Sequence, residues 1–152
     1  MPTGRAKKEM ILKPEQMIKA LQVVDEAAEN LKFQTSLWCT PFARLIVKSK
    51  YVSAGYCRTW NKEIEIDPAG NVLLCDISNI KFSNVREKGI FQAWKDQEED
   101  PLDKSLANPK LVEPCLSCQL KKKCRGGCFA RAELMGDIYA PDPLCPRVGG
   151  LI

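Results

Sequence analysis

The chain has 152 residues, which is enough for one domain of ordinary size or two small ones and too short for a complete eight-fold barrel. With 45% apolar and 28% charged residues the composition excludes wholesale disorder, and a net charge of +4 is too small to indicate a nucleic-acid partner. The sequence has eight cysteines and no histidine, which excludes imidazole catalysis and zinc sites with histidine ligands.

The beginning of the chain shows no secretory signal and no membrane span. Lys13 and Pro14 interrupt the basic start before an apolar segment forms, and the longest uncharged stretch, residues 33–43, is far shorter than a bilayer requires. We therefore expect a cytoplasmic protein with no membrane partner. Thiols in a reducing cytoplasm are more typical of metal ligands than of disulfides.

The first predicted element is an amphipathic helix. It begins near Pro14, which suits a first helical turn, and ends near Lys32. Apolar residues recur along it at steps of three and four: Met17, Leu21, Val24, Ala28 and Leu31. The helix contains no cysteine, so the chain is expected to divide into a leader, residues 1–34, and a cysteine-bearing body, residues 35–152.

The body is predicted to be a small, irregular α+β fold. Alternating residues 63–66, turn residues 67–70 and a second strand over residues 71–75 (NVLLC) predict a β-hairpin. Short helices are expected over residues 90–96 and 129–135, the second closed by Gly136. Asp67 and Asp142 are expected to form turns.

Cysteine spacing is the most specific pattern in the chain. Cys115, Cys118, Cys124 and Cys128 are separated by two, five and three residues, and Cys145 follows sixteen residues later. Upstream, Cys57 is followed after twelve residues by Gly70 and after four more by Cys75. Between Cys124 and Cys128, Gly126 and Gly127 either let the backbone approach inorganic sulfide or form an ordinary turn.

Three interpretations of these thiols compete. Disulfides are disfavoured without a secretory signal. Structural zinc usually takes two CxxC pairs, and only Cys115 and Cys118 form one. Iron–sulfur clusters also use such loops, although simple ferredoxins have two residues where this chain has five.

The order C-x12-G-x4-C, C-x2-C-x5-C-x3-C and a last cysteine resembles the SPASM domain, a carboxyl-terminal extension of many radical S-adenosylmethionine maturases. The segments around these cysteines agree with it: residues 66–75 (IDPAGNVLLC), 124–128 (CRGGC) and 142–146 (DPLCP). Residues 2–6 (PTGRA) resemble a loop late in the radical SAM barrel, so that residues 1–34 would be the end of that barrel.

The resemblance implies two auxiliary 4Fe-4S clusters. Cys57, Cys75 and Cys128 would bind the first, and Cys115, Cys118, Cys124 and Cys145 the second. Cys39 is the only spare thiol; it is either the fourth ligand of the first cluster or a small buried residue. The run Lys121–Lys123 and Arg125 would lie beside the second cluster, or form a solvated basic loop.

The resemblance also implies a function: electron relay and substrate docking for a radical SAM enzyme that modifies a peptide, a protein or a tetrapyrrole. The CxxxCxxC motif of the catalytic cluster is absent, so the chain is expected to be inactive alone. Its expected partners are a radical SAM barrel, which would bind S-adenosylmethionine, and a peptide or small-molecule substrate. The alternative is a zinc-stapled structural or interaction module without redox activity.

Overall fold

The computed structural model describes residues 5, 7–55 and 63–152. The chain divides into two compact units, the first made of Met1–Cys57 and Leu111–Ile152 and the second of Arg58–Lys110. Short strands and helices occur in both units, which confirms the α+β class. The expected boundary near residue 35 falls inside the first unit, and the assignment of residues 1–34 to a barrel stays a prediction. None of the described helices is long and apolar enough to cross a membrane.

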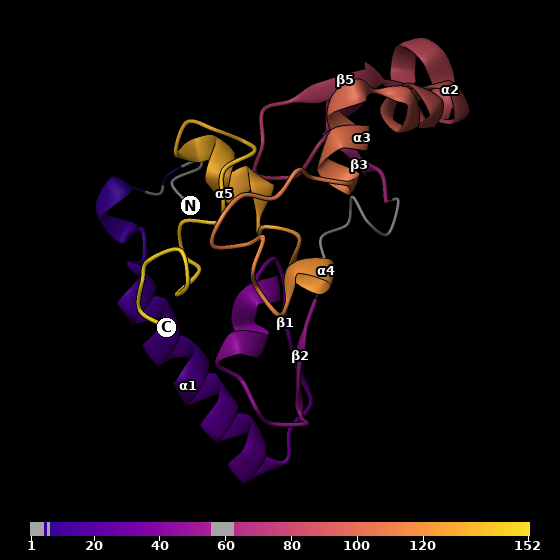
Figure 1. Ribbon diagram of the computed structural model, residues 1–152. Coiled ribbons are helices and arrows are strands. Elements are labelled where there is room, and N and C mark those ends of the chain that lie inside the picture. Colours follow the sequence, from indigo (N-terminus) through magenta and orange to yellow (C-terminus); the bar gives the residue numbers. More distant parts are fainter. Residues whose placement is uncertain (1–4, 6, 56–62) are drawn as a thin grey trace. The chain divides into compact units, whose positions relative to one another are not determined.

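The first unit begins with a 3-10 turn, η1 (Lys8–Met10), and the helix α1 (Pro14–Leu31), which runs as one long helix in Figure 1. Pro14 occupies its first turn, and the Gln16 side chain accepts a hydrogen bond of 2.8 Å from the Lys13 N–H. Lys32 ends the helix in the left-handed conformation, with φ of 51°. The predicted helix is therefore confirmed at both ends.

Two short parallel strands and a 3-10 helix follow, and the sequence did not predict them. β1 (Thr35–Leu37) pairs with β2 (Val52–Ala54), and η2 (Pro41–Leu45) lies between them in the chain. The Asp25 carboxylate of α1 accepts hydrogen bonds from the N–H groups of Lys48 and Ser49, at 3.0 and 2.7 Å. These bonds fix the loop before β2 to the helix. The core of the unit comes from all these segments and from the carboxyl-terminal part of the chain: Leu21, Ala28, Phe42, Ala43, Val47, Val52, Cys124 and Cys145.

The remaining elements of the first unit are two short helices, α4 (Lys121–Cys124) and α5 (Phe129–Leu134). The second corresponds to the helix predicted over residues 129–135, and Gly136 follows it with φ of 110°. The connections around both helices are turns.

The second unit is a three-stranded antiparallel sheet with two helices. The strands are β3 (Glu65–Ile66), β4 (Asn71–Leu73) and β5 (Lys81–Asn84), in the order β3-β4-β5. The predicted hairpin is β3-β4, and its turn is held by Asp67, which accepts a hydrogen bond of 2.9 Å from the Asn71 N–H. Gly70 closes the turn with φ of 88°. The third strand was not predicted.

The helices of the second unit extend well beyond the predicted residues 90–96. β5 leads into α2 (Val85–Glu99), which is kinked at Gly89, and α3 (Pro101–Ala107) follows (Figure 1). The Asn84 and Asp100 side chains cap these helices by accepting hydrogen bonds from Arg86 and Leu102, at 2.8 and 2.7 Å. The caps explain why these two segments are helical although they are rich in polar residues.

Candidate metal centre

Four cysteines of the first unit line one pocket: Cys115, Cys118, Cys124 and Cys145. They belong to three separate parts of the chain. Cys115 and Cys118 lie in a tight turn in which the Cys118 N–H donates to the Cys115 carbonyl at 3.2 Å, and Cys124 is the last residue of α4. Cys145 lies in a turn closed by its N–H and the Asp142 carbonyl, at 3.0 Å. This set is the one predicted for the second cluster.

Burial raises the pKa of three of these thiols, those of Cys115, Cys124 and Cys145. Cys118, Cys124 and Cys145 are 6–8% exposed. Loss of solvent first, and then the negative charge of neighbouring thiolates such as Cys145, raise the pKa of Cys124 to about 12 and that of Cys115 to about 11. Binding of a cationic iron core would replace the protons of these thiols.

Groups that stabilise negative sulfur surround the same pocket. The Leu120 N–H donates to the Cys118 Sγ at 3.4 Å. Burial raises the pKa of Cys145, but the backbone N–H groups of Val148 and Arg147 lower it in opposition. N–H donors of this kind are what sulfur ligands of a cluster require.

Positive charge lines the pocket as well. Lys121 and Arg147 are both lining residues, and the Arg147 charge lowers the pKa of Cys115 against the stronger effect of burial. The Arg147 Nη2 lies 3.3 Å from the Ser117 Oγ, whereas its Nε is buried with no hydrogen-bond partner among the described residues. Lys121 belongs to the predicted basic run, and Arg147 was missed.

The pocket between the sulfurs is small, at about 10 Å³, which is room for roughly one water molecule. Within residues 5, 7–55 and 63–152, no group of three or more Cys, Asp or Glu side chains is placed so that it could hold a metal ion. The chemistry of the donor set, four thiols, is nevertheless that of an iron–sulfur cluster site.

The residues predicted for the first cluster are not brought together by described geometry. Cys57 lies outside the described residues, Cys75 belongs to the second unit, and Cys128 belongs to the first. Cys75 follows β4 and is 7% exposed, and burial raises the pKa of its thiol to about 12. Cys128 immediately precedes α5 and is 6% exposed. Their grouping stays a prediction.

Cys39, the candidate fourth ligand, lies on the surface of the first unit. Its side chain is exposed, so the alternative interpretation as a small buried residue is wrong. Its backbone is left-handed, with φ of 53°, and its carbonyl accepts a hydrogen bond from Arg131. The structure leaves the ligand prediction untested.

An ion pair that the sequence analysis missed joins two of the cysteine-bearing segments. The Arg131 guanidinium donates to the Asp142 carboxylate, with Nη2 at 2.6 Å and Nε at 3.0 Å, and Asp142 is fully buried. The same carboxylate accepts the Cys128 N–H at 2.8 Å and the Leu144 N–H at 3.0 Å. We call Arg131 and Asp142 the buried clamp. Asp142 does form the expected turn, but it also fixes the segment of Cys128 to the segment of Cys145.

The clamp explains the glycine at position 127. Gly127 has φ of 95°, and a Cβ there would lie 2.2 Å from the Asp142 Cβ. Position 127 therefore requires glycine because its backbone lies so close to Asp142. Gly126 fits the predicted role better, because it lines the cysteine pocket.

Comparison with known proteins agrees with the cysteine pattern. A family model for an iron–sulfur cluster-binding domain, SPASM, matches residues 57–119. Residues 57–119 are a SPASM domain. The match contains Cys57, Cys75, Cys115 and Cys118, and the other predicted SPASM ligands, Cys124, Cys128 and Cys145, follow it. The resemblance found in the sequence is thereby confirmed.

Curated relatives extend the similarity beyond the SPASM match. The chain is 33% identical over 138 residues to the PqqA peptide cyclase of Rhizobium meliloti (strain 1021), covering 88% of the chain and 36% of the relative. It is 30% identical over 135 residues to the PqqA peptide cyclase of Bradyrhizobium diazoefficiens, covering 86% of the chain and 34% of the relative. The Methylobacterium sp. (strain 4-46) protein of the same name is 31% identical over 137 residues, which is 84% of the chain and 34% of the relative. The chain thus spans about a third of the length of these relatives.

Proposed function

We propose that the chain is the auxiliary cluster part of a radical SAM enzyme that modifies a peptide. The observation that carries this proposal is the single pocket lined by Cys115, Cys118, Cys124 and Cys145, which come from positions spread over 31 residues of sequence. Sulfur ligands, N–H donors and two cations around one pocket support an anionic iron–sulfur cluster there. The SPASM match and the names of the relatives support the choice of iron and of a peptide substrate.

In this proposal, the four thiols of the pocket hold one 4Fe-4S cluster, and Cys57, Cys75 and Cys128 hold the other, with Cys39 as candidate fourth ligand. When bound, the clusters would supply one-electron transfer. The chain's own residues do the rest: Lys121 and Arg147 offset the negative charge, and the buried clamp holds the segments of Cys128 and Cys145 at a fixed separation. A radical SAM barrel, with residues 1–34 as its last part, would bind S-adenosylmethionine. The cytoplasm would keep the thiols reduced before loading.

Iron and acid-labile sulfide analysis after anaerobic reconstitution tests the proposal. Two four-iron clusters give about eight irons and eight sulfides per chain. Cys118→Ala and Cys75→Ala, one for each predicted cluster, are each expected to leave about four irons, and the double variant close to none. Cys39→Ser, combined with Cys118→Ala, tests the candidate fourth ligand. Only the first cluster remains in the Cys118→Ala background, and its spectrum should change if Cys39 is one of its ligands.

The alternative function, a zinc-stapled module without redox activity, predicts different results in the same experiments. A colourless protein that binds zinc in preference to iron, or a Cys118→Ala variant that keeps all of its iron, would overturn the proposal. Brown colour that dithionite bleaches would support it.

A further inference from the structure

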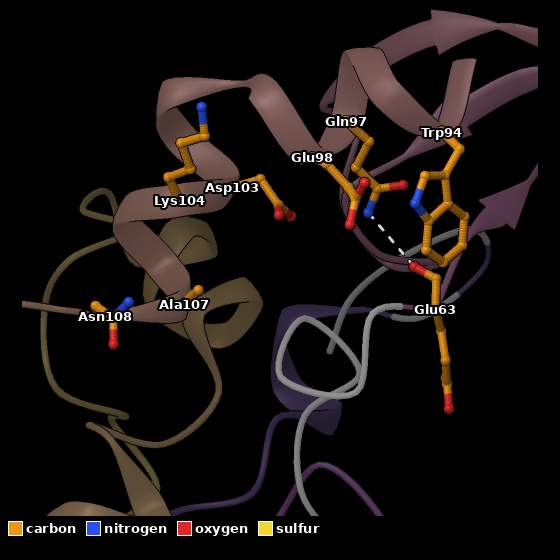
Figure 2. Close-up of a pocket in the computed structure, with 8 residues that line it drawn as sticks. All are labelled: Glu63, Trp94, Gln97, Glu98, Asp103, Lys104, Ala107 and Asn108. Atoms are coloured by element: carbon orange, nitrogen blue, oxygen red, sulfur yellow. Dashed lines mark hydrogen bonds between the residues drawn. The ribbon is translucent and has the colours of Figure 1, made fainter. Parts of the chain in front are cut away.

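The second unit contains a pocket without cysteine. It has a volume of about 290 Å³ and lies between α2, α3 and the segment before β3. Figure 2 shows the side chains that matter: Trp94, Gln97 and Glu98 on α2, Asp103 and Lys104 on α3, and Glu63. Its volume is at the lower end of small-ligand sites, which suits one long side chain rather than a large cofactor.

Gln97 is the residue that points to a ligand. It is only 7% exposed, and its Nε2 donates to the Glu63 carbonyl at 3.4 Å. That bond fixes which end of the amide is the oxygen, because a carbonyl can only accept. The remaining Oε1 is buried with no hydrogen-bond partner among the described residues. A buried acceptor of this kind calls for a donor, and the pocket that Gln97 lines is where the donor would enter.

The charged and aromatic side chains of this pocket indicate which kind of hydrogen-bond donor would bind. The lining residues include two with carboxylates near Gln97 (Glu98 and Asp103) and one lysine, Lys104, whereas Glu63 turns its backbone carbonyl to Gln97 and its side chain points away in Figure 2. In Figure 2 the carboxylates of Glu98 and Asp103 point into the space between the two helices. The Trp94 indole adds a face that attracts cations and packs against an aliphatic stem.

We propose that this pocket binds a cationic side chain, an ammonium or guanidinium on an aliphatic stem. Its charge would face Glu98 and Asp103, one N–H would donate to the Gln97 Oε1, and its stem would lie against Trp94. That the cation is a lysine or arginine of the substrate peptide rests on the proposed function. The chemistry of the site does not depend on it.

The test uses the full chain after iron reconstitution and four short peptides, acetyl-Gly-X-Gly-amide, where X is lysine, arginine, norleucine or glutamate. Binding is measured by calorimetry. Norleucine has a stem like that of lysine without the charge, and the arginine arm separates guanidinium from ammonium. Glu98→Gln removes a charge of the pocket, and Glu99→Gln, on the next residue of α2 but not in the lining, is the matched control. Gln97→Leu removes the acceptor.

We expect the lysine or arginine peptide to bind at least about tenfold more tightly than the norleucine peptide. Glu98→Gln and Gln97→Leu are expected to weaken this binding about tenfold, and Glu99→Gln to leave it unchanged. Equal binding of lysine and norleucine, tighter binding of glutamate, or equal effects of the two Glu→Gln variants would overturn the inference. Iron analysis of the same samples separates the two proposals. If the chain takes up no iron but still binds the lysine peptide more tightly than the norleucine peptide, the proposed function is refuted and the cation site is supported.

Discussion

Replacing Asp142 with asparagine would test whether the buried clamp organises the cysteine-bearing segments. Asparagine keeps the shape of the side chain and one acceptor oxygen, but removes the charge that faces Arg131. Both partners are almost fully buried, with 9% of the Arg131 side chain and none of Asp142 exposed. The variant therefore leaves a guanidinium in the interior without its counter-charge, and one of the two N–H groups, of Cys128 or Leu144, without its carboxylate oxygen.

The magnitude follows from this burial. Removing one partner of a buried ion pair costs about 3–5 kcal/mol, since the remaining charge stays desolvated. With a urea dependence of about 2 kcal/mol per molar, the unfolding midpoint should fall by roughly 1.5–2.5 M. Arg131→Met alone is expected to have an effect of similar size. The double variant should lose less than the sum of the two, because neither charge is then left alone.

The assay is urea unfolding of the anaerobically reconstituted full chain, followed by circular dichroism and by iron absorption. Glu26→Gln, on an exposed part of α1, is the control and should move the midpoint by less than about 0.3 M. If Asp142→Asn shifts the midpoint no further than this control, the clamp contributes nothing to stability and the reasoning is refuted. Additive effects of Arg131→Met and Asp142→Asn would show that the pair does not act as a unit.

Three other predictions give further tests. Gly127→Ala would place its Cβ 2.2 Å from the Asp142 Cβ and should destabilise the protein by more than about 2 kcal/mol. Its control is Gly136→Ala, which has φ of 110° and no atom near the added Cβ, and which should cost only the strain of the left-handed conformation, about 1–2 kcal/mol. Urea unfolding midpoints compare the two variants, and equal losses of stability would contradict the close approach. Arg147→Gln should lower the reduction potential of the proposed second cluster by on the order of tens of millivolts in a titration followed by electron paramagnetic resonance, and an unchanged potential would remove Arg147 from its surroundings. Hydrogen bonds from lysine, serine and glutamine neighbours hold the pKa of Asp96 well below its usual range. The Asp96 carboxylate therefore stabilises the fold above about pH 4, and this stabilisation is lost at lower pH. The difference in unfolding free energy between wild type and Asp96→Asn should narrow from pH 7 to pH 3, and a constant difference would contradict this prediction.

Local sequence patterns predicted the elements whose causes are local. The helix α1 follows from apolar spacing and Pro14, and the hairpin β3-β4 from alternation around Asp67 and Gly70. The length of α2 was underestimated and α3 was not predicted, because the apolar spacing in both is weak. Their ends are set by the caps Asn84 and Asp100.

Features made by residues far apart in the sequence could not be predicted from one sequence. β1 and β2 are each three residues long, too short for a periodicity, and they pair with each other across the intervening η2. The Arg131–Asp142 pair spans eleven positions, and nothing in a single sequence distinguishes its members from other charged residues. The four cysteines that line one pocket were grouped in advance through the resemblance of their spacing to a family pattern, and their role as metal ligands stays a prediction. Arg147 at the edge of this pocket has no such pattern.

The pocket also depends on chain that the SPASM match does not contain. Phe42 and Leu45 of η2 line it, and Cys124 and Cys145 belong to the same buried cluster as Phe42, Val47 and Val52. These walls lie before residue 57, and two of the four thiols lie after residue 119, outside the matched residues on both sides. Cys124 and Cys145 are therefore part of a hydrophobic core, and the amino-terminal segment supplies the apolar side of that core. Such walls exclude water from the sulfurs, which raises the pKa of Cys124 and would equally shield a bound cluster. The segment before residue 57 therefore contributes to the environment of these sulfurs as much as the matched residues do.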